Sequence, residues 1–133
     1  MRLVIDIHTH PVAIKESLRD NDSLAEAVRR VFGLFIEPQP LKTFLLQMDI
    51  SGVDQAVLLP VDCSTAHGCK LFSNEQIAEL VRICPRFIGF ASVDPHNPNA
   101  PNELEHAVKN LGLVGLKLDA ALQRFRLDDE EKA

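Results

Sequence analysis

The chain has no tryptophan and no tyrosine, and seven phenylalanines are its only large aromatic side chains among 133 residues. It also has no long run of lysine or arginine, and its formal net charge is −5. Nothing in this balance favours binding to nucleic acid, because such binding depends on clustered positive charge. No apolar run approaches the ~20 residues of a membrane span. We therefore expect neither a nucleic acid nor a membrane as partner.

Cysteine is also scarce. The three cysteines (Cys63, Cys69, Cys84) are an odd number, and the N-terminus lacks the basic segment, apolar stretch and cleavage site of a secretory signal. Reduced thiols in the cytoplasm are the expectation that follows.

What the chain does contain is a regular alternation of two hydrophobic patterns. Near-continuous Val/Ile/Leu content is typical of parallel strands covered on both faces. Between such runs lie stripes with the i, i+3, i+4, i+7 spacing of amphipathic helices. The predicted strands are residues 3–7, 55–61, 87–93 and 114–118, and the predicted helices follow the first three of them.

Several helix ends are marked in the sequence. Gly52 and Gly112 stand where helix C-caps are expected, Ser73 and Gln76 form a possible capping box, and Pro85 ends the second stripe. Strand, helix, strand, repeated three times, predicts right-handed βαβ units and a parallel sheet.

The first connection is long enough to hold an additional helix. Ser23 and Glu26 mark its start, and Gly33 and residues 37–40 end it. In a barrel this helical insertion would rise over the mouth. This insertion can be interpreted as a lid or substrate wall, or as plain structural padding.

Residues 5–11, IDIHTHP, carry the strongest chemical signal. Side chains alternate along a strand, so Asp6, His8 and His10 should share one face, with the histidines roughly 7 Å apart along it. Both imidazoles could then bend toward one zinc ion, with Asp6 orienting a ligand from behind. The alternative is that the two histidines close the strand for packing reasons alone. A polar triplet on the inner side of an apolar strand is costly unless satisfied, which favours the metal.

The chain resembles the amidohydrolase superfamily, specifically its amidohydrolase-related branch, which includes enzymes similar to aminocarboxymuconate-semialdehyde decarboxylase. The likeness begins at IDIHTHP and continues through residues 48–59. It is strongest at residues 85–95, PRFIGFASVDP, and extends through 111–118, LGLVGLKL. His-x-His alone would be weak, since other metallohydrolase barrels open with it.

The resemblance implies an α/β fold, a TIM (β/α)₈ barrel of which this chain is the N-terminal (β/α)₄ half. Residues 1–133 would form one partial barrel domain, ending after strand 4 where the acidic residues from Asp128 should begin a further helix. It also implies a divalent metal, often zinc, that activates water for hydrolysis or non-oxidative decarboxylation of a small carboxylated or cyclic substrate. The family takes its remaining ligands from strands five, six and eight, which lie beyond residue 133.

Three further residues are candidate substrate contacts. Lys117, in the predicted fourth strand, is a candidate substrate-facing cation. In distant branches such a lysine is a carboxylated metal bridge, and a solvated or ion-paired structural lysine is a third interpretation. Asp119 stands where family members commonly have a His-Pro. His67 follows the second strand, near the mouth; with Cys63 and Cys69 it lacks the paired spacing of a structural zinc site.

Two functional hypotheses follow. The chain is a metal-dependent hydrolase or part of one, or it is an inactive half-barrel that self-associates and binds metal weakly. Four parallel strands leave two unpaired edges, so we expect a homo-oligomer, in its simplest form a dimer of half-barrels.

Overall fold

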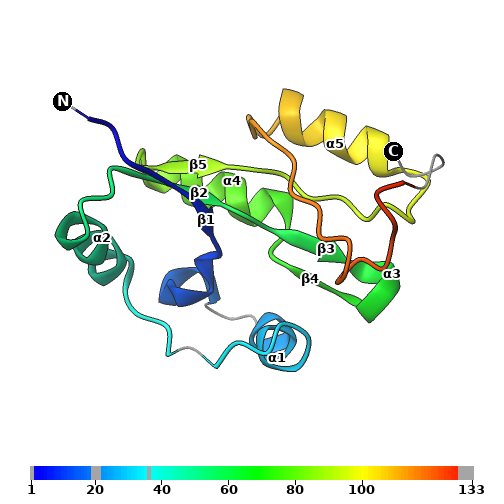
Figure 1. Cartoon of the computed structure of the whole chain (residues 1–133), viewed down its shortest axis with the longest axis horizontal. Helices are drawn as coiled ribbons and strands as arrows, with labels where there is room; N and C mark the ends of the chain where they lie inside the picture. Colours follow the sequence, from blue (N-terminus) through cyan, green and yellow to red (C-terminus); the bar gives the residue numbers. More distant parts are fainter. Residues whose placement is uncertain (1, 19–21, 36, 129–133) are drawn as a thin grey trace.

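A computed structural model describes residues 2–18, 22–35 and 37–128 of the chain. Strands and helices alternate along it (Figure 1). The elements in chain order are β1 (Ile5–Thr9), the 3-10 helices η1 (Pro11–Ala13) and η2 (Lys15–Leu18), α1 (Asp22–Arg30), α2 (Leu41–Ile50), β2 (Gln55–Leu58), β3 (Val61–Cys63), α3 (Ser64–His67), β4 (Cys69–Leu71), α4 (Asn74–Ile83), β5 (Phe87–Gly89) and α5 (Ala100–Lys109).

The main sheet is parallel, in the order β1-β2-β5. The segment after α5 adds a fourth position beside β5, because Val114 donates to the Gly89 carbonyl at 2.9 Å and Lys117 to the Ala91 carbonyl at 2.7 Å. Spatial order therefore follows chain order, which confirms the predicted α/β class and the half-barrel. The described residues form an open sheet and no closed barrel.

The second predicted strand, residues 55–61, is wrong in its second half. Pro60 has no N–H and cannot continue a sheet ladder, and the chain leaves the parallel sheet there. β3 then pairs antiparallel with β4, with the short helix α3 between them. This hairpin places Cys63 opposite Cys69 and was not predicted.

The other strands differ in extent. The first lies at Ile5–Thr9, two residues later than predicted, and the third is shorter, ending at Gly89. The fourth is reduced to an isolated parallel bridge between Ala91 and Leu116. Three backbone bonds still join the two segments, because Ala91 also donates to the Gly115 carbonyl at 2.7 Å.

The helix signals are confirmed where they can be examined. Ser73 and Gln76 form the reciprocal capping box of α4, and Gly52 and Gly112 adopt left-handed φ values of 66° and 71° after α2 and α5. α1 occupies the predicted insertion but begins at Asp22, one residue before the expected cap; the side chain of Ser23 lies outside the described residues. The expected start of a fourth helix, residues 128–131, also lies outside the described residues except for Asp128.

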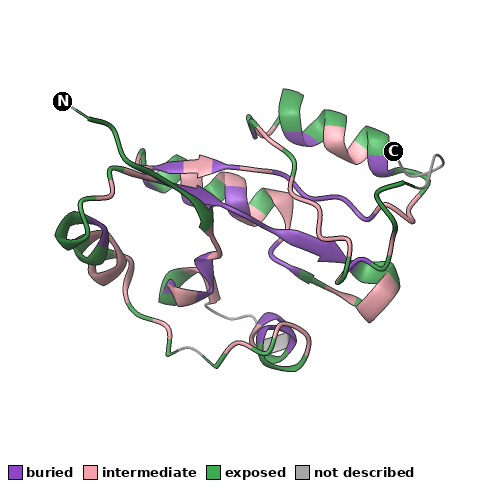
Figure 2. Cartoon of the chain, viewed as in Figure 1, coloured by how far each residue is buried: buried purple, intermediate pink, exposed green. Residues whose placement is uncertain are grey.

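The core lies between the sheet and its covering helices. α4 packs against β5 and α1 against β4, and β2 and β3 are buried almost throughout, whereas β1 is exposed (Figure 2). Gly89 allows close packing there, because a Cβ would come within 2.6 Å of a Leu113 methyl carbon. Across the described ranges, no helix has the length and hydropathy needed to cross a bilayer.

Candidate metal centre

The two motif histidines lie at the C-terminal end of β1, where a bulge interrupts the ladder. Asp6 is paired with Ala56 and Thr9 with Leu58, so two residues of β1 oppose one residue of β2. A bulge of this kind re-aims side chains and breaks strict alternation. The bulge explains how imidazoles from one strand come closer than the regular rise would bring them.

The side-chain nitrogens of the two histidines face each other. Their Nε2 atoms are 3.1 Å apart, and the ring centroids are 5.0 Å apart at an interplanar angle of 76°. Two nitrogens bound to one tetrahedral zinc at ~2.0–2.1 Å would lie roughly 3.3 Å apart. The separation in the protein is therefore close to that of two ligands of one ion.

The backbone of β2 sets the tautomer of His10. Its Nδ1 lies 2.8 Å from the Leu59 carbonyl oxygen, and a carbonyl can only accept, so Nδ1 carries the proton. In the neutral ring the free lone pair is then on Nε2, the atom that faces His8. Metal-binding histidines are commonly oriented by such a bond from the second nitrogen.

The environment of His10 favours its neutral form. Burial lowers the pKa of His10 below its usual value, and the charges of His8 and Lys117 lower it further, against the opposing effects of the Leu59 bond and Asp119. A neutral imidazole is the form that binds metal.

Lys117 and Asp119, two of the predicted substrate contacts, belong to this neighbourhood, since both act electrostatically on His10. Asp119 is held at both ends. Its backbone N–H donates to the Gln123 side-chain oxygen at 2.7 Å, and its carboxylate accepts from the Leu122 N–H at 2.9 Å. A cation and a carboxylate thus both contribute to the electrostatic environment of His10. Their contact with substrate stays a prediction.

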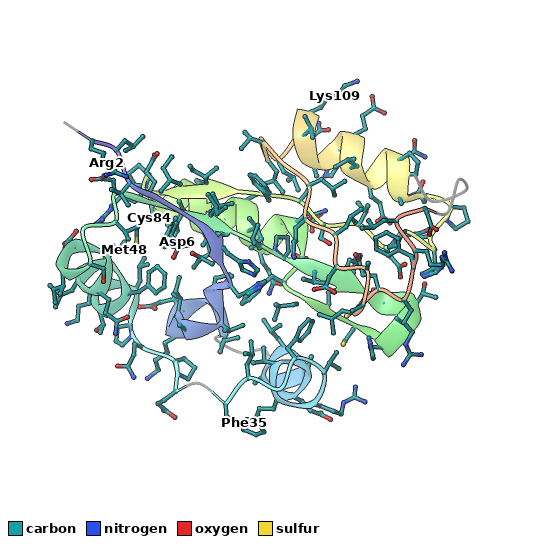
Figure 3. All side chains as sticks on the ribbon, viewed as in Figure 1. Arg2, Asp6, Phe35, Met48, Cys84 and Lys109 are labelled. Atoms are coloured by element: carbon teal, nitrogen blue, oxygen red, sulfur yellow. The ribbon has the colours of Figure 1, made fainter. Side chains whose placement is uncertain are left out.

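Asp6 and His67 have other surroundings. The Asp6 carboxylate accepts from the backbone N–H of His8 at 3.0 Å and is exposed; Figure 3 shows it on the β1 ribbon. It therefore supports the bulge backbone rather than an imidazole ring. His67 is half-buried at the end of α3, and no interaction with the pair is among those of the described residues. A role in substrate binding or ligand orientation stays a prediction for both.

Gln123 is a structural determinant that the sequence did not reveal. Its side chain is fully buried and donates to the carbonyls of Asp62 and Val93, each at 2.8 Å. His96 also bonds the Gln123 carbonyl through Nε2 at 2.8 Å. Glutamine is seldom fully buried. No spacing pattern marks a lone glutamine in a C-terminal turn, so this anchor could be found only in three dimensions.

The two histidines supply two nitrogen donors of the type that a divalent metal binds. Within residues 2–18, 22–35 and 37–128, no group of three or more histidine, cysteine or acidic side chains could enclose a metal ion. A polar cavity of about 330 Å³ lies elsewhere, lined by residues that include Asp62, Ser92 and His106. The donor set therefore fits a divalent metal as two ligands, with the remaining positions open.

Comparison with protein families gives a match. The sequence profile of a family described as amidohydrolase matches residues 5–133, which is nearly the whole chain. No curated protein matches.

Proposed function

Because the chain belongs to the amidohydrolase family, we propose that His8 and His10 bind a divalent metal for a hydrolase-type reaction. Family members generally use divalent metals. Zinc is the ion we propose, since imidazole nitrogen suits zinc better than the oxygen-preferring magnesium or calcium. The remaining ligands would come from water, substrate or other parts of the complete barrel.

The observation that carries this proposal is the convergence of the two Nε2 atoms at 3.1 Å, with the tautomer of His10 fixed by Leu59. With the lone pair of His10 on Nε2, either the His8 Nε2–H donates to it or the two nitrogens share a bound cation, and the 3.1 Å separation is compatible with both.

The chemistry proposed is that of the aminocarboxymuconate-semialdehyde decarboxylase-like branch. A bound metal would lower the pKa of a water molecule and polarise the substrate. Lys117 would attract the carboxylate of a small carboxylated or cyclic substrate, and Asp119 would offer a neighbouring hydrogen-bond acceptor. Hydrolysis and non-oxidative decarboxylation use the same groups up to this point.

Metal binding is tested by dialysing the apo chain against zinc and measuring the bound metal by mass spectrometry. His8→Ala and His10→Asn should each reduce zinc affinity at least about tenfold. The His10→Asn side chain retains a donor near Nδ1, so the Leu59 bond can persist while the ligand atom is lost. His106→Ala is the matched control, because His106 is exposed on α5.

Equal loss of zinc in His106→Ala, or no loss of zinc in the motif variants, would reject the metal site.

The reaction is assayed on the zinc-loaded chain with carboxylated amides, lactones and 2-oxo or aromatic acids. Release of carbon dioxide identifies decarboxylation, and a new carboxylate or amine identifies hydrolysis. Lys117→Met should raise KM for carboxylated substrates more than it lowers kcat.

The exposed edges of the sheet favour a second candidate, a half-barrel that self-associates. On the β1 side, Leu3 is 62% and Ile7 75% exposed, and on the other side Val114 is 71% exposed. Both edges run parallel, so β1 of one copy can continue the sheet beside residues 114–117 of another. Two copies related by a twofold axis would pair all four edges.

Self-association is tested by light scattering, which should give about twice 14.8 kDa. Ile7→Lys combined with Val114→Lys should shift the chain toward monomer, because each lysine places a charge on an edge that would be buried. Leu127→Lys is the control, since Leu127 is equally exposed at 79% but lies outside the sheet. A monomeric wild-type chain would contradict this candidate.

We also propose a cytoplasmic location. All three cysteines are free thiols, as is usual in a reducing compartment. Cell fractionation of the tagged chain tests it, and recovery in an oxidising compartment would contradict it.

A further inference from the structure

The β3–β4 hairpin contains two cysteines that the proposed metal chemistry does not use. Cys63 is the last residue of β3 and Cys69 the first of β4, and they are direct partners in the antiparallel register. Direct partners have Cα atoms ~4.5–5.5 Å apart and side chains on the same face. A disulfide needs a Cα separation of ~4.4–6.8 Å, so this pairing meets its main geometric requirement.

The Cys63 side chain reaches its partner residue across the hairpin. The Cys63 thiol donates to the Cys69 carbonyl at 3.2 Å. Burial raises the pKa of Cys63 to about 12, and the neighbouring Cys69 thiol contributes to this rise by its charge and by a hydrogen bond. Neither thiol is joined in a disulfide in this structure.

We propose that Cys63 and Cys69 form a reversible disulfide across the hairpin when the protein meets hydrogen peroxide.

The two thiols differ in access, and this sets the order of events. Cys63 is fully buried, whereas Cys69 is partly exposed and lines a cavity of about 260 Å³ between the hairpin and helices α1 and α4. Cys69 is therefore the thiol that a small peroxide reaches first. Cys63, protonated at neutral pH, is the resolving partner rather than the first nucleophile.

The reaction balances with one peroxide. The Cys69 thiolate attacks a peroxide oxygen, the O–O bond breaks, and a sulfenic acid and one water form. The Cys63 sulfur then attacks the Cys69 sulfur as its proton leaves; the S–O bond breaks, the S–S bond forms and a second water departs. Two thiols lose two electrons and two protons, and one peroxide becomes two waters. A dithiol reverses the step by exchange.

The hairpin is linked to the candidate metal centre, so its oxidation would act close to that site. Next to the cysteine pair in the hairpin, Asp62 forms an ion pair with Lys70 at 2.7 Å, and the Asp62 carbonyl accepts from Gln123. Gln123 in turn holds the Asp119 backbone. The disulfide would restrain β3, and Gln123, which holds Asp119, is bonded to the Asp62 carbonyl of that strand.

The test treats the reduced chain with hydrogen peroxide, blocks remaining thiols with iodoacetamide after denaturation, and digests with trypsin. Residues 43–70 form one tryptic peptide with both hairpin cysteines, and residues 83–86 form another with Cys84. The proposal expects the first peptide to lose about 2 Da, the two hydrogens, reversibly with dithiothreitol. Cys84 should be fully alkylated, since it is buried and far from the hairpin (Figure 3).

Variants make the result specific. Cys84→Ala should form the same intrapeptide disulfide as the wild type. Cys63→Ala should leave Cys69 as a sulfenic acid that dimedone traps, which shows that Cys69 reacts first and Cys63 resolves. Cys69→Ser should keep Cys63 reduced.

The proposal is overturned if wild-type Cys69 accumulates oxygen without the 2 Da loss. It is also overturned by a disulfide that involves Cys84, or by covalent dimers on a non-reducing gel in place of the intrapeptide bond. None of these outcomes depends on zinc binding, so failure here is distinct from failure of the proposed function.

Discussion

The Leu59 carbonyl oxygen lies 2.8 Å from Nδ1 of His10 and so decides which nitrogen of that ring is free. Leu59 itself is buried, and its N–H bonds back to the Thr9 carbonyl at 2.8 Å. The end of β2 is thus joined to the His-Thr-His motif by two bonds, one from the backbone and one from the side chain.

This relationship predicts separate structural and metal-binding effects at position 10. His10→Ala leaves the Leu59 carbonyl without its donor and should lower the free energy of unfolding by about 1–2 kcal/mol. His10→Asn can restore that bond and should recover at least half of the lost free energy of unfolding. Its zinc affinity should nevertheless be as low as that of His10→Ala. Urea denaturation of the metal-free variants measures this. Equal destabilisation by both substitutions would show that the Leu59 bond contributes little.

A second prediction concerns the buried glutamine. Gln123→Leu removes the donor to two carbonyls and the acceptor for the Asp119 N–H. Leaving such groups unsatisfied should cost about 2–4 kcal/mol in the free energy of unfolding. Gln47→Leu, on the exposed face of α2, should change it by less than about 0.5 kcal/mol. Similar urea midpoints for the two variants would contradict the anchoring role.

A third prediction follows from Asp94, which is 3% exposed. Burial alone would raise its pKa, but hydrogen bonds from the N–H groups of Thr65 and His96 more than offset this and lower the pKa below its usual 3.8. The folded state therefore favours the ionised form. The stabilisation is fully present above pH 3.8 and is lost as the pH falls through the lowered folded value.

Asp94→Asn should accordingly be less stable than wild type at pH 7, by about 1–3 kcal/mol, and the difference should shrink below pH 4. Thermal or urea unfolding at pH 7, 5, 4 and 3 gives the comparison. Glu79→Gln is the control, because Glu79 is exposed on α4 and its ion pair with Arg82 is solvated. A constant difference between wild type and Asp94→Asn across this range would refute the linkage.

The sequence carried enough information for the strand order and most helix ends. Ser73, Gln76, Gly52 and Gly112 act through local hydrogen bonds or a single φ angle, so their effect can be predicted from neighbouring residues alone. Pro60 could in principle have been recognised as the end of β2 by the same kind of argument, since it cannot donate to a ladder.

The features that were missed depend on contacts between distant segments. The bulge at His8 depends on the register of β1 against β2, and the burial of Gln123 on the convergence of two strand ends with a turn some 30 and 61 residues away. Hydrophobic periodicity contains neither kind of information. The histidine pair was identifiable because both side chains come from one short segment, but its 3.1 Å separation and the tautomer of His10 required the neighbouring strand.

The last prediction contrasts two glycines in the sheet. At Gly89 a Cβ would approach Leu113 at 2.6 Å and Ile77 and Val81 at 3.0 Å, where the core is closed on all sides. Gly89→Ala should therefore cost about 1–3 kcal/mol through overpacking. At Gly115 the Cβ would meet the ring of Phe90 at 2.5 Å. That ring is only half-buried, on the sheet face that lacks an opposing wall, and it can turn aside. Gly115→Ala should accordingly cost less free energy of unfolding than Gly89→Ala in urea denaturation of the isolated chain.

If the chain dimerises through its edges, the difference between the two variants should persist at low protein concentration. It should become smaller at high concentration, because a second copy would confine Phe90. The reverse order in dilute protein would mean that the inner face of the sheet is already closed.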